Sequence, residues 1–416
     1  MAYQELKKLY YKDQEEYNAE YARRFHSEDA VHLDFLVGDK PAFFVETTEV
    51  LRLALHITQL NQKITQLSQS LPGIAKEQYS KRCLIDEIVL TNNIEGVHSS
   101  RKEIGAALDL LEQQSKEKHP CIRFLGLVNK YWKLMHADRI PLQSCQDIRA
   151  LYDEVFLQEV LDENPANRPD GAVFRKESES VYSSTGKIIH QGVYPETAIL
   201  RCMEQALHFL NSDQTQPLYQ ICIFHYLFEY IHPFYDGNGR MGRLILSYCI
   251  AQTLEPLLAY HISATIKENL NQYYKAFESC NNPHNLADLT PFLLMQLEMI
   301  HHSMLDLQQT LQEKQTQLER YLSMFQNMEQ DRFALYSILI QAALFSEEGI
   351  AQKDLMRVLH IKSYSTFKKK IDRIPQQLLI TRVKGKGHAK YYELNLRDLD
   401  EILLQQGPDA QFEETV

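Results

Sequence analysis

The chain has 416 residues, enough for two or three domains, and its 44% hydrophobic and 24% charged residues exclude wholesale disorder. Its net charge of −11 excludes a general nucleic-acid binder. It has no apolar stretch of about 18 residues that would predict a membrane span, and no signal-peptide core. None of its seven cysteines forms a C-x-x-C pair, so we expect buried thiols in a cytoplasmic protein.

Residues 1–114 predict a helical N-terminal domain. Apolar residues at three- and four-residue spacing predict a helix over 50–71, which ends at a Leu-Pro-Gly break. A second helix is expected from about 75 to 95, because Gly96 stands where a C-terminal capping glycine is common. Ser100 and Glu103 have the spacing of a capping box and predict the start of another helix.

Residues 115–285 predict a second helical domain, with helices near 121–137, 144–158, 195–211, 216–231, 238–255 and 265–279. The segment 162–195 differs because it is rich in Asn, Pro, Asp, Gly and Ser. Within it, SESVYSSTGKIIHQG, residues 178–192, predicts two short strands around a Ser-Thr-Gly turn. An irregular surface loop is the alternative.

Residues 286–330 predict long connecting helices. Four leucines, Leu307, Leu311, Leu318 and Leu322, have the spacing of a heptad seam. Packing within the chain is favoured over a coiled coil, and a homodimer is an open alternative.

Residues 331–396 resemble a winged helix-turn-helix domain, because three helices, the last after Ser363, are expected before strands over 379–383 and 389–394. Between 351 and 395, eleven Lys and Arg against three Asp and Glu give a charge of +8. Such a basic helix and wing predict contact with DNA, and protein packing or dimerisation is the alternative. With an acidic tail over 397–416, the whole sequence predicts a mainly α fold with a small β-hairpin and a C-terminal winged helix-turn-helix domain.

The strongest chemical pattern is HPFYDGNGRMGR, residues 232–243, which lies between two apolar helices. Gly237 and Gly239 let a ligand approach the backbone closely, and the helix N-terminus that follows favours an anion. Asn238 adds side-chain donors. Arg240 and Arg243 share one helix face and offer two guanidinium groups, so the segment predicts a polyphosphate cradle.

Two more residues of this segment predict catalytic chemistry. Asp236 offers a carboxylate suited to Mg²⁺ that bridges phosphates. His232 offers an imidazole that can take a proton from an attacking hydroxyl near neutral pH. A base, a metal ligand and a phosphate cradle within twelve residues indicate phosphoryl or nucleotidyl transfer, and the spacing does not fit a Walker loop.

The segment resembles the signature of the Fic family, HPFx[D/E]GNGRxxR, at every position, and the resemblance covers about residues 35–280. It implies a Fic-type helical core and AMPylation, in which a Ser, Thr or Tyr hydroxyl of a target protein attacks the α-phosphate of ATP. It also implies that His232 is the base, that Asp236 holds Mg²⁺ and that Arg240 and Arg243 contact the β- and γ-phosphates. The implied nucleotide-binding residues are Gly237, Asn238, Gly239, Arg240, Met241, Gly242 and Arg243.

The glycine at 239 bears on the kind of transfer. The related phosphotransferase branch of the family has lysine where Gly239 stands, so the resemblance favours the adenylylating branch.

A second segment, TNNIEG at residues 91–96, resembles the family's inhibitory motif, [S/T]xxxE[G/N]. Thr91 and Glu95 are four residues apart and therefore share one helix face. The resemblance implies that Glu95 pairs with Arg243 and misplaces the γ-phosphate, as in the subclass whose inhibitory helix lies in its N-terminal domain. An ordinary helix end with a solvated glutamate is the alternative, and in some relatives this glutamate also serves in AMP removal.

The predicted hairpin lies where the family has a flap that pairs with an extended target segment. The resemblance therefore implies target docking by Val181, Tyr182, Ile188 and Ile189. Asn269 resembles a position that contacts the nucleotide, and a solvent-facing Asn is the alternative. His225, His301 and His302 are predicted to be structural.

The sequence indicates neither the target protein nor the trigger that relieves inhibition, and self-modification is an open alternative. One rival function is a DNA-binding regulator whose Fic core only senses a nucleotide. The other rivals are transfer of UMP, GMP or phosphocholine, and removal of AMP.

Overall fold

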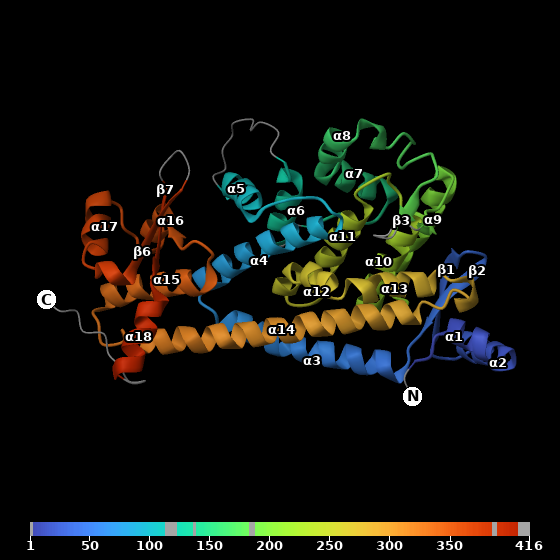
Figure 1. The fold of residues 1–416 in the computed structure, drawn as a ribbon, viewed down its shortest axis with the longest axis horizontal. Helices are drawn as coiled ribbons and strands as arrows, with labels where there is room; N and C mark the ends of the chain where they lie inside the picture. The colour runs from blue at the N-terminus through green and yellow to red at the C-terminus, as the bar shows by residue number, and fades with distance from the viewer. Residues whose placement is uncertain (1–2, 113–122, 136–138, 183–187, 385–388, 407–416) are drawn as a thin grey trace. The chain divides into compact units, whose positions relative to one another are not determined.

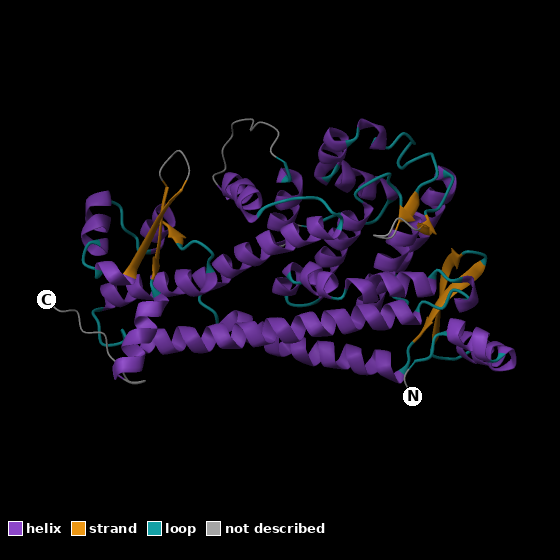
Figure 2. Ribbon diagram, in the orientation of Figure 1, coloured by secondary structure: helices purple, strands orange, loops and turns teal. Residues whose placement is uncertain are grey.

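The computed structural model describes residues 3–112, 123–135, 139–182, 188–384 and 389–406 (Figure 1). Helices dominate, as Figure 2 shows, which confirms the predicted mainly α fold class. The chain divides into two compact units, Met1–Gln62 with Leu84–Leu305 and Lys63–Cys83 with Asp306–Val416. Short 3₁₀ turns lie at Pro165–Asn167, Pro256–Tyr260, Pro283–Asn285 and Gln376–Leu378.

The first unit begins with two short helices, α1 (Leu6–Lys12) and α2 (Gln14–Phe25). Asp13 separates them and accepts hydrogen bonds from two N–H groups in the first turn of α2. This N-cap satisfies donors that have no partner within the helix, so α2 begins at a defined residue.

A β-hairpin follows that the sequence reasoning missed. β1 (Ala30–Val37) and β2 (Lys40–Val45) pair antiparallel, and the turn between them uses Gly38 at a φ of +64°. Alternate side chains along the second half of β1 are buried and exposed, which is the pattern of a strand that covers a core on one face. That alternation, with a glycine turn after it, is the signal that could have predicted the hairpin.

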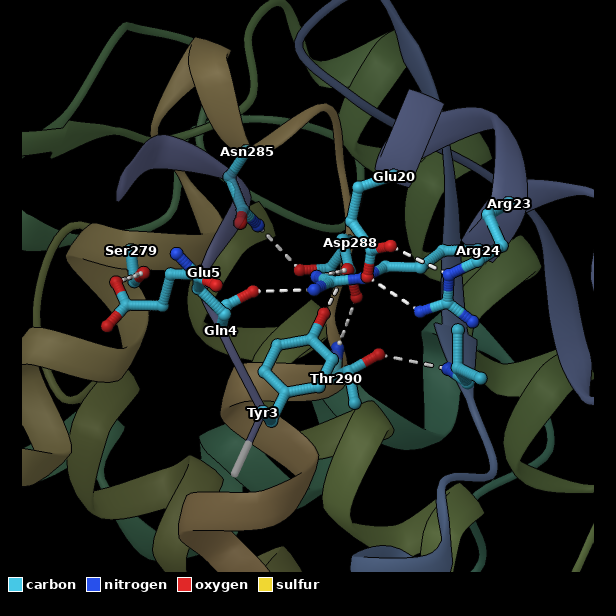
Figure 3. Close-up of polar contacts among 11 residues, drawn as sticks. Tyr3, Gln4, Glu5, Glu20, Arg23, Arg24, Ser279, Asn285, Asp288 and Thr290 are labelled. Carbon is cyan, nitrogen blue, oxygen red and sulfur yellow. Dashed lines mark hydrogen bonds and ion pairs between the residues drawn. The ribbon is translucent and has the colours of Figure 1, made fainter. Parts of the chain in front are cut away.

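A buried polar cluster anchors the start of the chain to Asp288 (Figure 3). Tyr3 donates its hydroxyl to the Asp288 carboxylate. The Arg24 guanidinium lies 3.3 Å from the same carboxylate and donates to the carbonyl oxygen of Gln4 over 2.6 Å. Because Arg24 and Asp288 are both buried, these added hydrogen bonds are needed to offset the desolvation of the pair.

The core of the first unit includes one strongly apolar helix, α10 (Pro217–Ile231), which α9 and α11 pack against. Its sequence is apolar on every face, so nearly all of its side chains are buried. The other helices of this unit are α5 (Arg101–Glu112), α6 (Leu125–Met135), α7 (Cys145–Val155), α8 (Leu157–Glu163), α9 (Glu196–Leu210), α11 (Asn238–Thr253), α12 (Ile262–Glu268) and α13 (Leu270–Cys280). α5 confirms the helix predicted after Ser100, and the later helices confirm those predicted between 115 and 285, with breaks at Phe156 and Asn269.

Long helices cross the boundary between the two units: α3 (Thr48–Ser70), α4 (Gly73–Ile94) and α14 (Thr290–Ser323). α3 and α4 confirm the helices predicted over 50–71 and 75–95. Three of the four leucines in the predicted seam of α14 are buried, so this seam packs within the chain.

The predicted hairpin within 178–192 is present as β3 (Ser180–Tyr182) and β4 (Ile188–Gln191). The strands are antiparallel, with Ser180 opposite Gln191 and Tyr182 opposite Ile188. The predicted Ser-Thr-Gly turn lies outside the described residues.

The second unit has the element order predicted for residues 331–396. Its helices and strands are α15 (Gln330–Phe345), β5 (Ile350–Ala351), α16 (Gln352–Val358), α17 (Tyr364–Ile371), β6 (Leu379–Lys384), β7 (Ala389–Leu394) and α18 (Leu396–Gln406). Ser363 caps α17 by accepting a hydrogen bond from the Thr366 N–H. β5 joins the predicted hairpin in a sheet of order β5-β7-β6. The winged-helix assignment stays a prediction.

The predicted acidic tail over 397–416 is wrong in its first part. Residues 396–406 form α18, in which Leu399 and Leu403 are buried because they lie four residues apart on one helix face. The rest of that predicted tail lies outside the described residues. Of the described helices, none is long and apolar enough to cross a membrane.

Candidate active site

The signature segment forms a loop between α10 and α11 that two left-handed residues delimit. α10 ends at Ile231, and His232 follows it at a φ of +53°, with its N–H bonded to the Phe228 carbonyl oxygen at 3.0 Å. Gly237 is the N-cap of α11 and has a φ of +81°. A non-glycine residue at positive φ is strained and persists only where the surroundings hold it, so the backbone of His232 is held in place by its neighbours.

Two side chains fix the shape of this loop. The Asn238 amide accepts a hydrogen bond from the Phe234 N–H at 3.0 Å and donates to the Phe234 carbonyl oxygen at 2.8 Å. Tyr152 of α7 stacks on the Phe234 ring at 3.7 Å and donates its hydroxyl to the Asp236 carbonyl oxygen at 3.1 Å. The Asn238 side chain therefore shapes the loop in this structure, where the sequence predicted a donor to phosphate.

His232 is a neutral imidazole at neutral pH. Burial, together with the positive charge of Arg175 and the neighbouring His190, lowers the pKa of His232 to about 3. The Nδ1 atom of His232 is buried and has no hydrogen-bond partner among the described residues. A neutral ring can accept a proton, which is what a general base must do.

Arg240 is a buried cation that has hydrogen-bond donors without a partner among the described residues. Its Nη1 donates to Oε1 of Glu159 on α8 at 2.7 Å, and its guanidinium carbon lies 5.4 Å from the centre of the Phe156 ring. Nε and Nη2 of Arg240 are buried and have no hydrogen-bond partner among the described residues. Because such unpaired donors are costly, these two nitrogens fit an anionic ligand such as a phosphate group.

Arg243 is held by the predicted inhibitory segment. Its Nη2 lies 2.7 Å from Oε1 of Glu95, and its Nε donates to the Thr91 hydroxyl at 2.8 Å. Arg243 is 2% exposed at its side chain and Glu95 34% exposed. The predicted pairing of Glu95 with Arg243 is thus present, and the carboxylate is the more accessible partner.

The glycines of α11 leave room for two carboxylates. A Cβ atom at Gly239 would collide with Oε1 of Glu95, and one at Gly242 would collide with Oε1 of Glu229. Burial raises the pKa of Glu229 to about 8, so this carboxyl is mostly protonated at neutral pH. The first turn of α11 therefore lies directly under the Glu95 carboxylate.

The remaining predicted residues contribute in different ways. Met241 is fully buried on α11, so its side chain is part of the core. The Asn269 amide donates to the Thr265 carbonyl oxygen at 2.9 Å, at the junction of α12 and α13. Val181, Tyr182, Ile188 and Ile189 lie on the two strands of the hairpin, where only their backbone is described.

The donor set fits Mg²⁺ that is held mainly by a nucleotide. Asp236 offers one carboxylate, which accepts a hydrogen bond from the Gly237 N–H in the structure. Within the described ranges, no group of three or more His, Cys, Asp and Glu side chains could hold a metal by itself. Mg²⁺ commonly binds through one or two carboxylates and completes its shell with phosphate oxygens and water, so a single Asp is sufficient.

Three residues around the site were missed by the sequence reasoning: Glu159, Arg175 and Glu87. Glu159 holds Arg240 from 81 residues away, and Arg175 donates to the His232 carbonyl oxygen from 57 residues away. No short motif links positions this far apart. Their individual signals, a Glu on an amphipathic helix and an Arg in a loop, are those of ordinary surface residues.

The fold and the site together define a mainly helical protein with two buried arginines on the helix that follows a neutral histidine. Residues 143–250, which include the signature, match the Fic/DOC family. Over these residues, which are a minority of its length, the chain therefore resembles the Fic/DOC family.

Relatives with curated names share parts of this chain. "Protein adenylyltransferase Fic" of Drosophila grimshawi is 33% identical over 94 residues, which cover 22% of this chain and 18% of that protein. The protein of the same name from Drosophila yakuba is 31% identical over 183 residues, 44% of this chain and 33% of that protein. The chain thus matches a third or less of the length of these two relatives.

Among solved structures, a Fic family protein from Desulfovibrio desulfuricans G20 has 21% sequence identity and a TM-score of 0.49. The match covers 84% of this chain and 96% of that one. Fic-1 from C. elegans has 18% identity and a TM-score of 0.41, over 63% of this chain and 74% of that chain.

Proposed function

We propose that the chain is a protein adenylyltransferase, which transfers AMP from ATP to a Ser, Thr or Tyr hydroxyl of a target protein and is restrained by its own Glu95. The observation that carries this proposal is the pair of buried arginines on α11, of which Arg240 keeps two unpaired nitrogens, beside the neutral His232. The names of the relatives, which call those proteins adenylyltransferases, agree with it.

The chemistry assigns one task to each group. The hydroxyl oxygen of the target bonds to the α-phosphorus of ATP, the bond from that phosphorus to the β-bridging oxygen breaks, and pyrophosphate leaves. His232 takes the hydroxyl proton as the new bond forms. Asp236 would hold Mg²⁺, which when bound neutralises charge on the phosphates.

The two arginines orient the nucleotide. Arg240 already has Nη1 fixed by Glu159, so Nε and Nη2 are positioned to donate to phosphate oxygens. Arg243 can take the γ-phosphate only after Glu95 leaves it, because one guanidinium edge cannot hold both groups at 2.7 Å. In the resting protein a bound nucleotide would therefore lack one of its two cations.

Initial-rate transfer of labelled AMP from ATP tests the proposal, with cell extract and the chain itself as acceptors. We expect Glu95→Gly to raise the rate, because it frees Arg243 and restores positioning that can be worth about 10²-fold. Adding Arg243→Ala to that variant should abolish the gain. His232→Ala in the Glu95→Gly background should reduce transfer by about 10²- to 10⁴-fold while ATP binding persists.

Labelled UTP, GTP and CDP-choline, used in parallel, distinguish the rival transfers, and loss of label from modified protein tests AMP removal. Absence of AMP transfer from ATP by Glu95→Gly would contradict the proposed function. A rate that Glu95→Gly leaves unchanged or lowers would contradict the inhibitory role of Glu95.

We also propose, as a second function, that residues 351–395 contact DNA. Lys362, Lys368 and Lys369 are exposed at or near α17, which supports this proposal. The positive charge of α17 is partly compensated, because Lys370 on the same helix pairs with Asp331. Residence in the cytoplasm and assembly into a homodimer likewise remain proposals.

A further inference from the structure

The geometry points to Arg175 as a positioning residue that holds the backbone of His232 and the outer ends of β3 and β4 in one arrangement. Arg175 precedes β3 and lies 57 residues before His232. This inference rests on the proposed function only in taking His232 as the base.

Each side-chain nitrogen of Arg175 donates to a backbone carbonyl oxygen. Nε donates to His232 over 2.9 Å, Nη1 to Glu177 over 2.5 Å and Nη2 to Val193 over 2.9 Å. The Arg175 N–H donates to the carbonyl oxygen of Pro233 over 3.2 Å. Since Glu177 lies before β3 and Val193 after β4, one guanidinium connects the loop of the base with both ends of the hairpin.

The buried positive charge of Arg175 requires hydrogen-bond acceptors at defined positions. The side chain is fully buried, and no ion pair of the described residues includes it. A buried cation without a direct ion pair is costly; the charge of Glu179 offsets part of that cost, and carbonyl dipoles offset more only when they are held in the correct directions. The left-handed backbone of His232 supplies one of these carbonyls, so the strained residue and the cation stabilise each other.

Gly192 gives independent support. A Cβ atom there would collide with Nη2 of Arg175 and would lie 3.0 Å from Cβ of His232. The Gly192 N–H is bonded to the Glu179 carbonyl oxygen at 2.9 Å, and the Val193 N–H to that of Ile231 at 3.1 Å. The backbone at Gly192, directly after β4, therefore packs on the guanidinium and on the base without an intervening side chain.

A lysine cannot replace this residue. Its ammonium is a single donor centre, whereas the planar guanidinium of Arg175 spans carbonyls on both sides of the loop. In the Glu95→Gly background, we expect Arg175→Lys and Arg175→Met to lower kcat for AMP transfer by about 10²-fold, because the base and the target segment lose their shared alignment. The Kd for ATP should stay within about twofold, since Arg175 does not belong to the phosphate cradle.

Two measurements on the full chain do not depend on activity. Burial is the main cause of the low pKa of His232 and the charge of Arg175 is the second, so histidine-selective NMR should show that this pKa rises above about 3 in Arg175→Met, where only the second cause is removed. Hydrogen exchange should show faster exchange at the amides of Gly192 and Val193. Gly192→Ala should reproduce the exchange result while it keeps the guanidinium.

The matched control is Arg149→Met, which removes another arginine that donates to a nearby backbone carbonyl, that of Val173 at 2.7 Å. It should change none of these readouts. Unchanged histidine titration in Arg175→Met, together with unchanged amide exchange in Arg175→Met and Gly192→Ala, would overturn the inference, whatever the transfer rates. Absence of transfer by every variant, with the NMR and exchange changes present, would instead reject the proposed function and keep Arg175 as a positioning residue.

Discussion

Arg240 and Arg243 are neighbours on α11, and each is paired with a carboxylate from a different part of the chain. Glu95 holds Arg243 and is one-third exposed, whereas Glu159 holds Arg240 and is 6% exposed at its side chain. The two pairs therefore differ in how easily they can open. We infer that Glu95 can leave its arginine for a ligand, while Glu159 is a permanent part of the cradle.

Glu159 should consequently be needed for stability. Glu159→Ala leaves the Arg240 cation buried without its partner, and breaking a buried pair in this way costs about 3–5 kcal/mol. Glu159→Gln keeps an oxygen that can accept from Nη1 and should cost less. Urea unfolding of the full chain measures both, and the control Glu163→Ala, at an exposed carboxylate paired with Arg123, should cost at most about 1 kcal/mol. Equal losses at Glu159 and Glu163 would contradict this.

The low pKa of His232 predicts acid sensitivity. The folded protein keeps His232 neutral down to a pKa of about 3, whereas the unfolded chain binds a proton below the usual pKa of 6.5. The stability contributed by this residue is therefore present above pH 6.5 and is lost as the pH falls toward 3, at up to about 1.4 kcal/mol per pH unit.

The His232→Ala variant does not lose this stability at low pH, because it has no imidazole at this position. The difference in the free energy of unfolding between wild type and variant should therefore shrink as the pH is lowered below 6.5. Urea titrations at several pH values measure it. The buried His225 and His261 are present in both proteins and cancel in the difference. A difference independent of pH would show that His232 is not held neutral.

At the scale of elements, α4 is fixed to the core by a stripe of residues four apart, Glu87, Thr91 and, just after the helix, Glu95. Glu87 accepts hydrogen bonds from the N–H and the hydroxyl of Ser263, at 2.9 and 2.6 Å. Thr91 and Glu95 bind Arg243. Glu95 thus follows the end of a helix that is bonded to the rest of the first unit one and two turns earlier.

The buried Glu87 predicts a pH effect of opposite sign to that of His232. Burial raises the pKa of Glu87 from 4.5 to about 7, so the folded protein retains a proton that the unfolded chain releases. Stability contributed by this carboxyl is present below pH 4.5 and is lost as the pH rises to about 7. Compared with wild type, Glu87→Gln should therefore become relatively more stable across that window in thermal unfolding.

Glu103→Gln is the control for Glu87. Its side chain is exposed, and hydrogen bonds from Ser100 lower the pKa of Glu103. The stability difference between wild type and Glu103→Gln should therefore change with pH in the opposite direction, and only slightly. The same trend in both variants would mean that burial of Glu87 is not the cause.

Elements with a strong repeat could be predicted from the sequence. The apolar spacing of α3 and the all-apolar stretch of α10 define those helices locally, and the signature segment defines the loop between α10 and α11. Likewise, Ser363 defines the start of α17 locally, through the hydrogen bond that its side chain accepts at the N-cap. These features depend on residues within about one or two turns of each other, which sequence patterns report well.

Most of the features that were missed depend on the tertiary structure. The alternation along β1 was a local signal that was overlooked, whereas α18 is short and its burial of Leu399 and Leu403 depends on the fold. Glu159, Arg175 and Glu87 each meet their partner across 57 to 176 residues, so their roles are set by the fold alone. The pKa of His232 is likewise set by its burial and by Arg175.

At the scale of the whole molecule, the net charge of −11 conceals a strongly basic segment at residues 351–395, with +8. The rest of the chain then carries −19, which follows from −11 minus +8. An acidic body repels nucleic acid while a basic face attracts it, so binding through 351–395 should depend steeply on salt.

Lys368→Glu with Lys369→Glu in the full chain should weaken binding to a short labelled duplex and reduce the slope of log K against log salt by about 2, since about 0.9 is lost for each phosphate contact. Fluorescence anisotropy at several salt concentrations measures it. Lys12→Glu with Lys102→Glu changes the net charge equally at exposed lysines elsewhere and is the control. Binding that the two double variants weaken equally, or no salt-sensitive binding by wild type, would reject the DNA proposal.

The position of Glu95 above Gly239 also constrains how this sequence can evolve. Any side chain at residue 239 would occupy the space of the Glu95 carboxylate, which would have to move away from Arg243. A lineage that replaced Gly239 first would break the Glu95–Arg243 pair, whereas a lineage that lost Glu95 first would have room for a side chain at residue 239. The two positions are therefore epistatic, and the order in which they mutate decides which descendants pass through an ancestor whose Arg243 lacks its carboxylate partner.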